Sequence, residues 1–464
     1  MSFVFFDTET TGLRRGFDQI VHFAAIKTDN DLNEVDRFET RSRLLPFVVP
    51  NPSALLTSGI TIERLQAREL PSHSSMVAAI ERILSEWSPS IFVGYNSIRF
   101  DEEMLRHALF QSLRPAYLTS QPRNGRADAL TLMMAASALS PAAVSVPTGQ
   151  SGRPTFRLGT MAMANGVAHG LAHDAMGDAE ATLELCRLVK DRSPDVWQRF
   201  VRFSSKASVR DFVDSGDAFV LTEFFGGNAY HTPVIRLGQD PRAPNARLCL
   251  SLGCDVSALV GATDAELADV LAGKPSPIRR LRINAAPTVT ALYDATAEML
   301  GGNDQSKLEE LANRIREDTL LCSRLTEAYV ANRPQLVMSR YVEERIYDGM
   351  LGPDDEQRMH DFHDASWPDA YKVVERFEDE RLRTFGLRLL YLGDRSVLPD
   401  DVRRSVELEM TDRLLDNSPE GYSLQRALRE TEALLMEQPG SHILIGYRGY
   451  LFERIDRVQK FRVR

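Results

Sequence analysis

Two carboxylates follow the first apolar run of the chain, and their spacing is the first sign of chemistry. Residues 3–6 are bulky and apolar, and Asp7 and Glu9 come next with one residue between them. Because side chains alternate between the faces of a strand, both carboxylates are expected to project together from the end of a buried strand. Two anions held this close repel each other unless a cation lies between them, and oxygen ligands suit Mg²⁺ or Mn²⁺. An isolated pair of this kind is more often the polar end of a strand that enters a Thr-Gly turn.

Three later residues have matching chemistry. Asp101 begins a predicted helix directly after a predicted strand, where aspartate also serves as an ordinary helix N-cap. His173 lies in the loop before another predicted helix, and Asp178 lies about one turn inside it, so both can face the same point. A lone histidine in such a loop is usually a surface residue or a polar core residue. In open α/β sheets, however, a site forms beyond the carboxyl ends of the strands, where this set is expected to gather.

The elements that position these residues follow from the hydrophobic periodicity. Strands are predicted over residues 20–27, 36–44 and 91–96, and helices over 74–87 and from 156 to 166. Strands that alternate with helices predict an α/β sheet with helices on its faces.

The pattern changes near Pro194. Short apolar runs predict strands over residues 218–221, 232–237, 247–252 and 280–284. Apolar residues then follow helical spacing over residues 375–392, 400–415, 424–437 and 443–460. We therefore expect three domains, which cover residues 1–193, 194–340 and 341–464.

The composition is that of a soluble globular protein. The chain has 464 residues, of which 43% are hydrophobic and 26% are charged, enough for several domains with their own cores. It has neither an apolar run as long as a membrane span nor a signal-peptide pattern, so we expect a cytoplasmic protein. The four cysteines form no C-x-x-C pair, which argues against a zinc or disulfide framework. A net charge of −10 argues against coating nucleic acid by bulk charge, although a local basic groove is compatible with it.

The acids and the histidine resemble, in chain order, the motifs of the DEDDh family of 3′-to-5′ exonucleases. The segments that carry this resemblance are F-D-T-E-T-T-G at 6–12, G-Y-N-S-I-R-F-D at 94–101 and H-D-A-M-G-D-A at 173–179. Within the family, the chain is similar to the bacterial enzymes that degrade single-stranded DNA. This similarity continues through E-F-F-G-G-N at 223–228 and V-E-E-R-I-Y-D-G at 342–349.

The resemblance implies both a fold and an activity. The implied fold is α/β, with a ribonuclease-H-like mixed sheet flanked by helices, an SH3-like small β-barrel domain and an all-helical C-terminal domain. The implied activity is 3′-to-5′ hydrolysis of single-stranded DNA to nucleoside 5′-monophosphates, in DNA repair and recombination. The implied partners are single-stranded DNA and the single-strand DNA-binding protein, with no membrane, and the implied state is a monomer.

The resemblance also assigns roles to residues of this sequence. Two Mg²⁺ ions, which Mn²⁺ can replace, would be held by Asp7, Glu9, Asp101 and Asp178. His173 would remove a proton from the attacking water. The substrate would contact Glu9, Arg157, Arg106 and Tyr117. For Arg106 a solvated surface charge is an equally good interpretation, and Tyr117 could equally belong to the core.

The sequence departs from the family pattern in places and leaves other functions open. The first motif has Thr8 and Thr11 where the best-known relative has aromatic residues, and the region 117–126 lacks the tryptophans expected to stack bases. A ribonuclease of the same family that trims RNA 3′ ends would use the same active site. A nucleic-acid-binding scaffold with a silent nuclease fold is a third possibility, against which the five intact catalytic positions argue.

Overall fold

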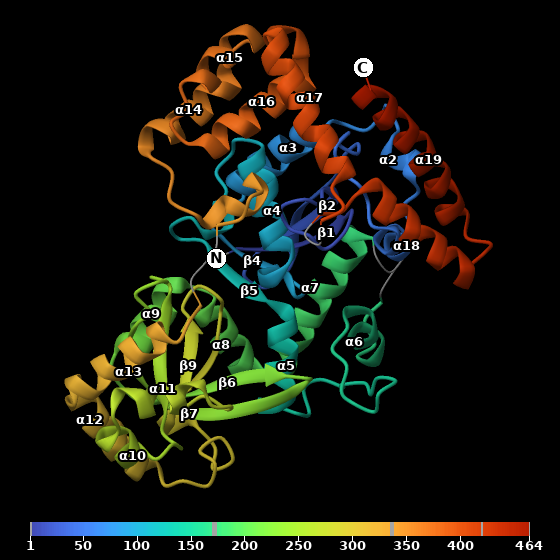
Figure 1. Cartoon of the computed structure of the whole chain (residues 1–464). Coiled ribbons are helices and arrows are strands. Elements are labelled where there is room, and N and C mark those ends of the chain that lie inside the picture. The colour runs from blue at the N-terminus through green and yellow to red at the C-terminus, as the bar shows by residue number, and fades with distance from the viewer. Residues whose placement is uncertain (1, 169–173, 335–337, 419–420, 464) are drawn as a thin grey trace.

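A five-stranded mixed sheet forms the centre of the amino-terminal part of the protein (Figure 1). The structure is a computed structural model that describes residues 2–168, 174–334, 338–418 and 421–463. The strands lie in the order β3-β2-β1-β4-β5. Their bounds are β1 Ser2–Thr10, β2 Ile20–Thr28, β3 Glu34–Arg41, β4 Ser90–Gly94 and β5 Gly125–Asp128. β2 pairs antiparallel with β1 and β3, whereas β4 pairs parallel with β1 and β5.

Alternating side chains of β1 fill two separate cores, one on each face of the sheet. Phe3 and Phe5 belong to the core that contains residues of α5 and α7. Val4 and Phe6 belong to the core that contains residues of α3 and α4. The bounds of these helices are α3 His73–Glu86, α4 Asp101–Gln111, α5 Ala129–Leu139 and α7 Ala175–Arg192. The helices thus cover both faces of the sheet, as the alternation of strands and helices predicts.

A second sheet, of five antiparallel strands, follows in the chain. Its strands lie in the order β10-β6-β7-β8-β9, so β10 and β9 form its edges. Their bounds are β6 Phe219–Phe225, β7 Asn228–Gln239, β8 Ala246–Ser251, β9 Ile278–Arg282 and β10 Thr288–Ala291. This is the part of the chain for which the sequence predicts an SH3-like small barrel, and the four predicted strands are present. The fifth strand, β10, is not predicted by the sequence.

Helices cover this second sheet and connect it to the first. Its core includes residues of α10 Val256–Gly261, α11 Asp264–Ala272, α12 Gln305–Glu317 and α13 Thr319–Ala331. On α8 (Pro194–Phe203), the ring of Trp197 lies 5.4 Å from the ring of Phe3 in the first sheet. Phe203 at the end of α8 and Val209 on α9 (Lys206–Asp214) instead join a core of the second sheet. The segment that links the two sheets, α8 and α9, is therefore packed against both of them.

The carboxyl-terminal helices pack against the amino-terminal part of the chain. Their bounds are α14 Pro353–Asp364, α15 Trp367–Glu375, α16 Glu380–Asp394, α17 Asp400–Leu415, α18 Leu424–Glu437 and α19 His442–Val463. Figure 1 shows them, in orange and red, beside α2 (Ile62–Leu65) and α3. Tyr447 is fully buried in one core with Val21 and Leu55, and its hydroxyl donates to the Pro50 carbonyl at 2.5 Å. These helices thus share a core with the first sheet. The division of the chain into three domains at residues 193 and 340 stays a prediction.

Most predicted helix bounds agree with the structure, but one does not. α17 and α18 have the predicted bounds, and α6 (Leu158–Ala164) lies inside the predicted range of 156–166. The helix predicted over 375–392 is wrong at its start, because α15 ends at Glu375 and Asp379 caps a new helix, α16, by accepting from the Arg381 amide. No helix within the described ranges combines the length and the hydrophobicity needed to cross a membrane.

A buried ion cluster connects the carboxyl-terminal helices to the loop that follows β1. Glu343 is 1% exposed, and its carboxylate accepts from Arg388 at 2.6 Å and also from Arg413. The backbone beside it touches Gly16, where an added Cβ would lie only 2.7 Å from the Glu343 carbonyl oxygen. This close approach explains why a glycine stands in the loop.

Replacing Glu343 with glutamine is expected to lower the free energy of unfolding by roughly 3 kcal/mol or more, because the substitution leaves buried arginine charge uncompensated. Urea unfolding monitored by circular dichroism measures this change. The matched control is Glu344→Gln, which removes the same charge from the neighbouring exposed residue and should change stability by less than about 0.5 kcal/mol. Equal unfolding curves for the two variants would contradict a stabilising role for the cluster.

Candidate active site

The end of β1 and the first turn of α7 bring three carboxylates together. Asp7 and Glu9 continue the face of β1 that α7 covers, because they lie two and four residues beyond Phe5. Asp178 lies in the first turn of α7. One carboxylate oxygen from each of these acids lies within 4.8 Å of the others. The structure therefore gathers three of the residues that the sequence singles out into one carboxylate cluster, Asp7, Glu9 and Asp178.

Asp101 reaches the carboxylate cluster from the opposite face of β1. Thr8 points to that face, and its hydroxyl donates to Asp101 Oδ1 at 2.5 Å. Asp101 begins α4 and is 4% exposed. Its negative charge acts on Asp7 and Glu9, so the fourth predicted acid also belongs to the site. His173, the fifth predicted residue, lies outside the described residues.

Asp128 fixes the turn that leads from β4 to Asp101. This buried side chain stands at the end of β5 and accepts from the Asn96 amide at 2.8 Å and the Ile98 amide at 3.3 Å. It also caps α5 by accepting from the Leu130 amide. Sequence reasoning did not single out Asp128, although an aspartate directly before an apolar helix is a recognisable N-cap signal.

Burial and mutual repulsion raise the pKa values of the acids at this site. Burial, with the charges of Asp178 and Asp101, raises the pKa of Glu9 to about 8. Burial raises the pKa of Asp101 to about 7, even though the hydrogen bond from Thr8 lowers it. The pKa of Asp7 is also well above its usual value, through burial and then the charges of Asp101 and Asp178. These raised pKa values favour protonated carboxyl groups at the site as long as no cation is bound.

The ligand atoms of the carboxylate cluster fit a hard divalent cation. All of them are carboxylate oxygens, which Mg²⁺ and Mn²⁺ prefer. Among the residues that the structure describes, no lysine or arginine forms an ion pair with Asp7, Glu9 or Asp101. The described neighbours of Asp7, Glu9 and Asp101 thus supply no positive charge through an ion pair, and a metal ion is the natural source of it.

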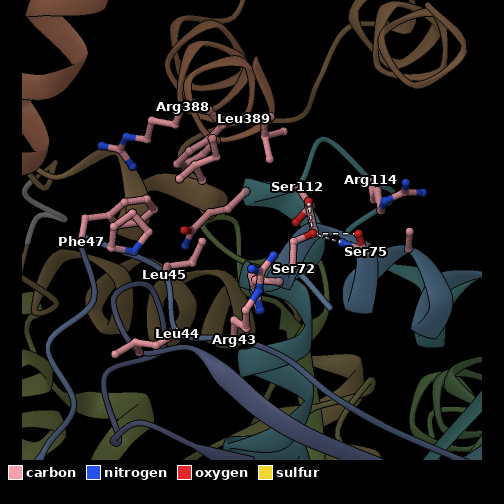
Figure 2. A pocket seen from close by; sticks show the side chains of 18 of the residues that line it. Arg43, Leu44, Leu45, Phe47, Ser72, Ser75, Ser112, Arg114, Arg388 and Leu389 are labelled. Atoms are coloured by element: carbon pink, nitrogen blue, oxygen red, sulfur yellow. Dashed lines mark hydrogen bonds between the residues drawn. The ribbon is translucent and has the colours of Figure 1, made fainter. Parts of the chain in front are cut away.

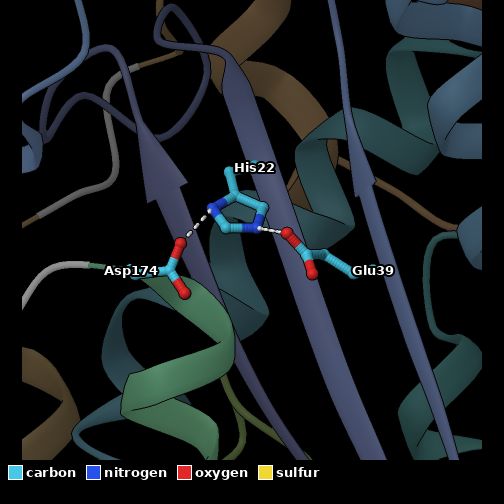
Figure 3. Close-up of side chains that lie close together, drawn as sticks. All are labelled: His22, Glu39 and Asp174. Carbon is cyan, nitrogen blue, oxygen red and sulfur yellow. Dashed lines mark hydrogen bonds and ion pairs between the residues drawn. The ribbon is translucent and has the colours of Figure 1, made fainter. Parts of the chain in front are cut away.

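A second group of ionisable residues lies beside the carboxylate cluster, at the start of α7 (Figure 3). The two ring nitrogens of His22, on β2, face acids on both sides: Nε2 lies 3.0 Å from Glu39, and Nδ1 lies 3.8 Å from Asp174. Arg41 binds the same two carboxylates, at 2.6 Å and 3.1 Å. Because Arg41 supplies the positive charge, this group is an ion-pair network and not a second metal centre.

This network holds the start of α7 in place. Asp174 is the N-cap of α7, and its side chain accepts from the Gly177 amide. Its carbonyl accepts from the Asp178 amide at 2.9 Å. The network therefore acts on the turn that carries Asp178. Sequence reasoning missed it, although His22 stands directly opposite Glu9 in the β1–β2 register, a position that the predicted meander could have suggested.

The residues predicted to contact substrate lie in different environments. Arg157 is exposed at the N-cap of α6, where the carbonyl of its neighbour Phe156 accepts from the Tyr95 hydroxyl at 2.5 Å. Arg106 is 7% exposed, and its guanidinium lies 5.4 Å from the ring centre of Tyr117, which is 38% exposed.

The guanidinium of Arg106 is already engaged by other protein groups. It donates to Glu103 at 3.1 Å and to Ser120 at 2.9 Å, and Glu102 lies 3.5 Å away. The environment does not match the solvated surface charge that was the alternative interpretation. The predicted contacts of Arg106, Tyr117, Arg157 and Glu9 with a DNA strand stay predictions.

Comparison with known families identifies the part of the chain that contains these acids. Residues 4–186 match the family model described as exonuclease. We call residues 4–186 the exonuclease domain, after the family model that they match. The exonuclease domain includes the carboxylate cluster, Asp101 and the ion-pair network at the start of α7.

The similarity extends beyond the exonuclease domain. The chain is 29% identical to exodeoxyribonuclease I of Escherichia coli over an aligned length of 375 residues, and the alignment covers 77% of this chain and 78% of that protein. It is 29% identical to exodeoxyribonuclease I of Haemophilus influenzae over an aligned length of 407 residues, and the alignment covers 82% of this chain and 84% of that protein.

Solved structures with the same fold include exonuclease I of Escherichia coli in complex with a dA16 oligonucleotide. That structure has a TM-score of 0.84 at 23% identity and covers 98% of this chain and 99% of its own. Exonuclease I of Methylocaldum szegediense also has a TM-score of 0.84, at 24% identity and with the same coverage. The mixed sheet, the second sheet and the carboxyl-terminal helices therefore form one known arrangement.

In the metal-free protein, stability is expected to fall as the pH rises from 4.5 to about 8, the interval over which folding raises the pKa of Glu9. Over this range the folded state binds more protons than the unfolded state, and rising pH removes that advantage. Thermal unfolding in EDTA at several pH values measures the slope. Glu9→Gln should flatten it, whereas Glu69→Gln, an exposed control, should not. Added Mg²⁺ should raise Tm most at the upper end of the range. An unchanged slope in Glu9→Gln would contradict this account.

Proposed function

We propose that the protein is a metal-dependent exodeoxyribonuclease that degrades single-stranded DNA in the 3′-to-5′ direction and releases nucleoside 5′-monophosphates. The observation that carries the proposal is the carboxylate cluster, whose oxygens lie within 4.8 Å of one another inside an exonuclease domain. Similarity to exodeoxyribonuclease I over 77% of the chain supports DNA as the substrate. We further propose that the protein is a cytoplasmic monomer and that it acts in DNA repair and recombination together with single-strand DNA-binding protein.

Mg²⁺ is the proposed cofactor, as two ions that Mn²⁺ can replace. Asp7, Glu9 and Asp178 would hold the metal, and Asp101 would complete the site. When bound, the ions acidify water and stabilise the charge that develops on the phosphate. The protein's own contribution is to hold these acids on rigid elements: β1 is packed on both faces, and Thr8 fixes the Asp101 carboxylate by a hydrogen bond.

Other residues would act directly on water and DNA. His173 would accept the proton of the attacking water, since a histidine titrates near neutral pH. Arg157, exposed at the N-cap of α6, would bind a substrate phosphate, and Glu9 would also contact the terminal nucleotide. Tyr117 would stack on a base of the incoming strand, with Arg106 behind its ring.

A group of arginines next to Asp101 suits the phosphates of the incoming strand. Burial and then the charges of Arg280, Arg99 and Arg126 lower the pKa of Arg282, while the charge of Glu103 raises it. Of these four arginines, Arg126 also pairs with Glu102 at 2.7 Å. They come from both sheets and from the short turn Ser97–Arg99, which ends just before Asp101. Clustered arginines at such a place favour a polyanion. We name Arg99, Arg126, Arg280 and Arg282 the arginine group.

Residues 274–282 contain four basic residues, Lys274, Arg279, Arg280 and Arg282, and two of the arginines are already engaged by acids. Arg279 lies 3.3 Å from Glu223, and Arg280 lies 2.9 Å from the fully buried Asp240. Neutralising these two would disturb structural ion pairs. Arg99 and Arg282 form no ion pair with the residues that the structure describes, which makes them the better candidates for phosphate contacts.

Release of labelled nucleotides from single-stranded DNA, duplex DNA and RNA, each with Mg²⁺ and with EDTA, tests the proposed function. We expect Mg²⁺-dependent release from the 3′ end of single-stranded DNA. Asp7→Ala and Asp178→Ala should abolish it while the circular dichroism spectrum stays unchanged, because they remove metal ligands and also relieve repulsion. The exposed control Asp31→Ala should retain full activity. Preferred cleavage of RNA would favour the exoribonuclease alternative, and no cleavage of any substrate would favour a silent scaffold.

The double substitution of Arg99 and Arg282 by alanine is expected to reduce the number of nucleotides removed from a long single strand in one encounter. It should also flatten the salt dependence, because fewer phosphate contacts form and fewer counterions are released on binding. Cleavage of a very short oligonucleotide should change much less, because its few phosphates barely leave the site. Product lengths under single-encounter conditions measure both effects. Arg429 and Arg448, exposed on the carboxyl-terminal helices, provide the matched control pair. An equal loss on long and short substrates would show that the arginine group does not bind the strand.

A further inference from the structure

A cavity of about 730 Å³ lies between the exonuclease domain and the carboxyl-terminal helices (Figure 2). One wall consists of the segment after β3, the start of α3 and the end of α4, and the other consists of residues from α14, α15, α16 and α19. No residue of the carboxylate cluster lines it. Its volume is in the range of small-molecule sites, roughly 300–1,000 Å³.

The charge of the lining is one-sided. Four arginines contribute to it, and among the described residues no aspartate or glutamate does: Arg43, Arg114, Arg388 and Arg454. The whole chain shows the opposite balance, with 65 acidic and 55 basic residues. A concave surface lined by one sign of charge focuses the electrostatic potential and attracts ions of the other sign. Behind the lining, Arg114 pairs with Glu81, and Arg388 pairs with Glu343 and Glu409. Arg43 and Arg454 have no acidic partner among the described residues, so their positive charge is the part that favours an anion.

Several of these arginines retain hydrogen-bond donors without a partner. The Arg43 side chain makes no hydrogen bond or ion pair with the part of the chain that the structure describes. The Nε atoms of Arg114, Arg388 and Arg454 are buried and have no hydrogen-bond partner there. Buried donors without acceptors are unfavourable, and an anion with several oxygens is a suitable acceptor.

Serine hydroxyls add to this polar side of the cavity. Ser72 caps the 14-residue helix α3 and lies 2.7 Å from the hydroxyl of Ser75. Both line the cavity, and Figure 2 shows them near Arg114, with Arg388 on the opposite side. The start of a helix carries partial positive charge and free amide groups, which favour phosphate. The helix start and the arginines thus favour the same kind of ligand group.

An exposed aromatic ring lines the cavity as well. Trp367, at the start of α15, is 43% exposed. One part of its ring packs directly on Gly393, where an added Cβ would lie 2.2 Å from a ring carbon. The rest of the ring remains accessible to a flat ligand, and bases stack on such rings.

From these contacts we propose that the cavity is a nucleotide-binding site separate from the carboxylate cluster, with the phosphate at Arg43 and the start of α3 and the base on Trp367. A nucleoside 5′-monophosphate has both of the required parts, a phosphate dianion and an aromatic base. Two sources share this chemistry, a free nucleotide and the phosphorylated 5′ end of a DNA strand. The inference concerns binding alone, so it does not depend on cleavage by the proposed active site.

Tryptophan fluorescence gives a direct test in the full-length protein. The chain has three tryptophans, of which Trp87 and Trp197 are only 4% and 6% exposed, so quenching by a stacked base reports on Trp367. Titration with deoxyadenosine 5′-monophosphate in EDTA, which removes metal from the carboxylate cluster, should give saturable quenching. Arg43→Ala should raise Kd roughly tenfold or more, because it removes a charged donor to the phosphate. The exposed control Arg68→Ala should leave Kd unchanged.

Further ligands and variants separate the remaining outcomes. Inorganic phosphate should compete, and adenosine should bind much more weakly. Trp367→Phe should remove the fluorescence change, while equilibrium dialysis still detects weaker binding. An oligonucleotide that binds only with its 5′ phosphate would identify the strand end as the source, whereas preference for the mononucleotide would identify the free form.

The proposal would be overturned by an Arg43→Ala variant with unchanged Kd, by the absence of binding in dialysis, or by binding that Asp7→Ala abolishes. Cleavage of single-stranded DNA is measured separately. Failure of the proposed function and failure of this site are therefore distinguishable.

Discussion

Repulsion among Asp7, Glu9 and Asp178 is the constraint on which the rest of the exonuclease domain depends. Ionised carboxylates within 4.8 Å of one another do not stay together unless rigid elements hold them. β1 provides that rigidity because its alternating side chains are buried in separate cores on both faces. α7 packs on the same face of β1 as two of the acids and brings the third. The packing energy of the two cores thus holds an arrangement that a bound cation would stabilise.

The described neighbours of Asp7, Glu9 and Asp101 fix the positions of these acids and form no ion pair with them. Thr8 holds Asp101 through a neutral hydroxyl, and Asp128 holds the preceding turn through backbone amides. Arg41, at the end of β3, forms ion pairs with Glu39 and Asp174. Positive charge therefore supports the start of α7 without neutralising the ligands of a metal.

The carboxyl-terminal helices complete the exonuclease domain. Tyr447 is buried with residues of β2 and α1 (Pro52–Ser58), and the rings of Phe385 and Phe110 lie 5.5 Å apart between α16 and α4. Glu343 connects the same helices to the loop after β1. The large cavity with four arginines forms where these two parts of the chain meet. The carboxyl-terminal helices thus pack against the exonuclease domain and also form one wall of the cavity with four arginines.

Local sequence patterns were enough to predict the elements with strong periodicity and the residues inside short motifs. The alternation along β1 and the periodicity of α17 and α18 were predicted correctly, because each depends on neighbours in sequence. The motif residues Asp7, Glu9 and Asp178 do lie together, while their roles stay predictions. Tertiary structure alone decided the rest. β5 has the weak strand sequence Gly-Arg-Ala-Asp and forms because β4 supplies its pairing partner. Arg106 is buried because Glu102, Glu103 and Ser120 surround it. The four arginines of the cavity come from distant segments, and only the packing of those segments brings them together.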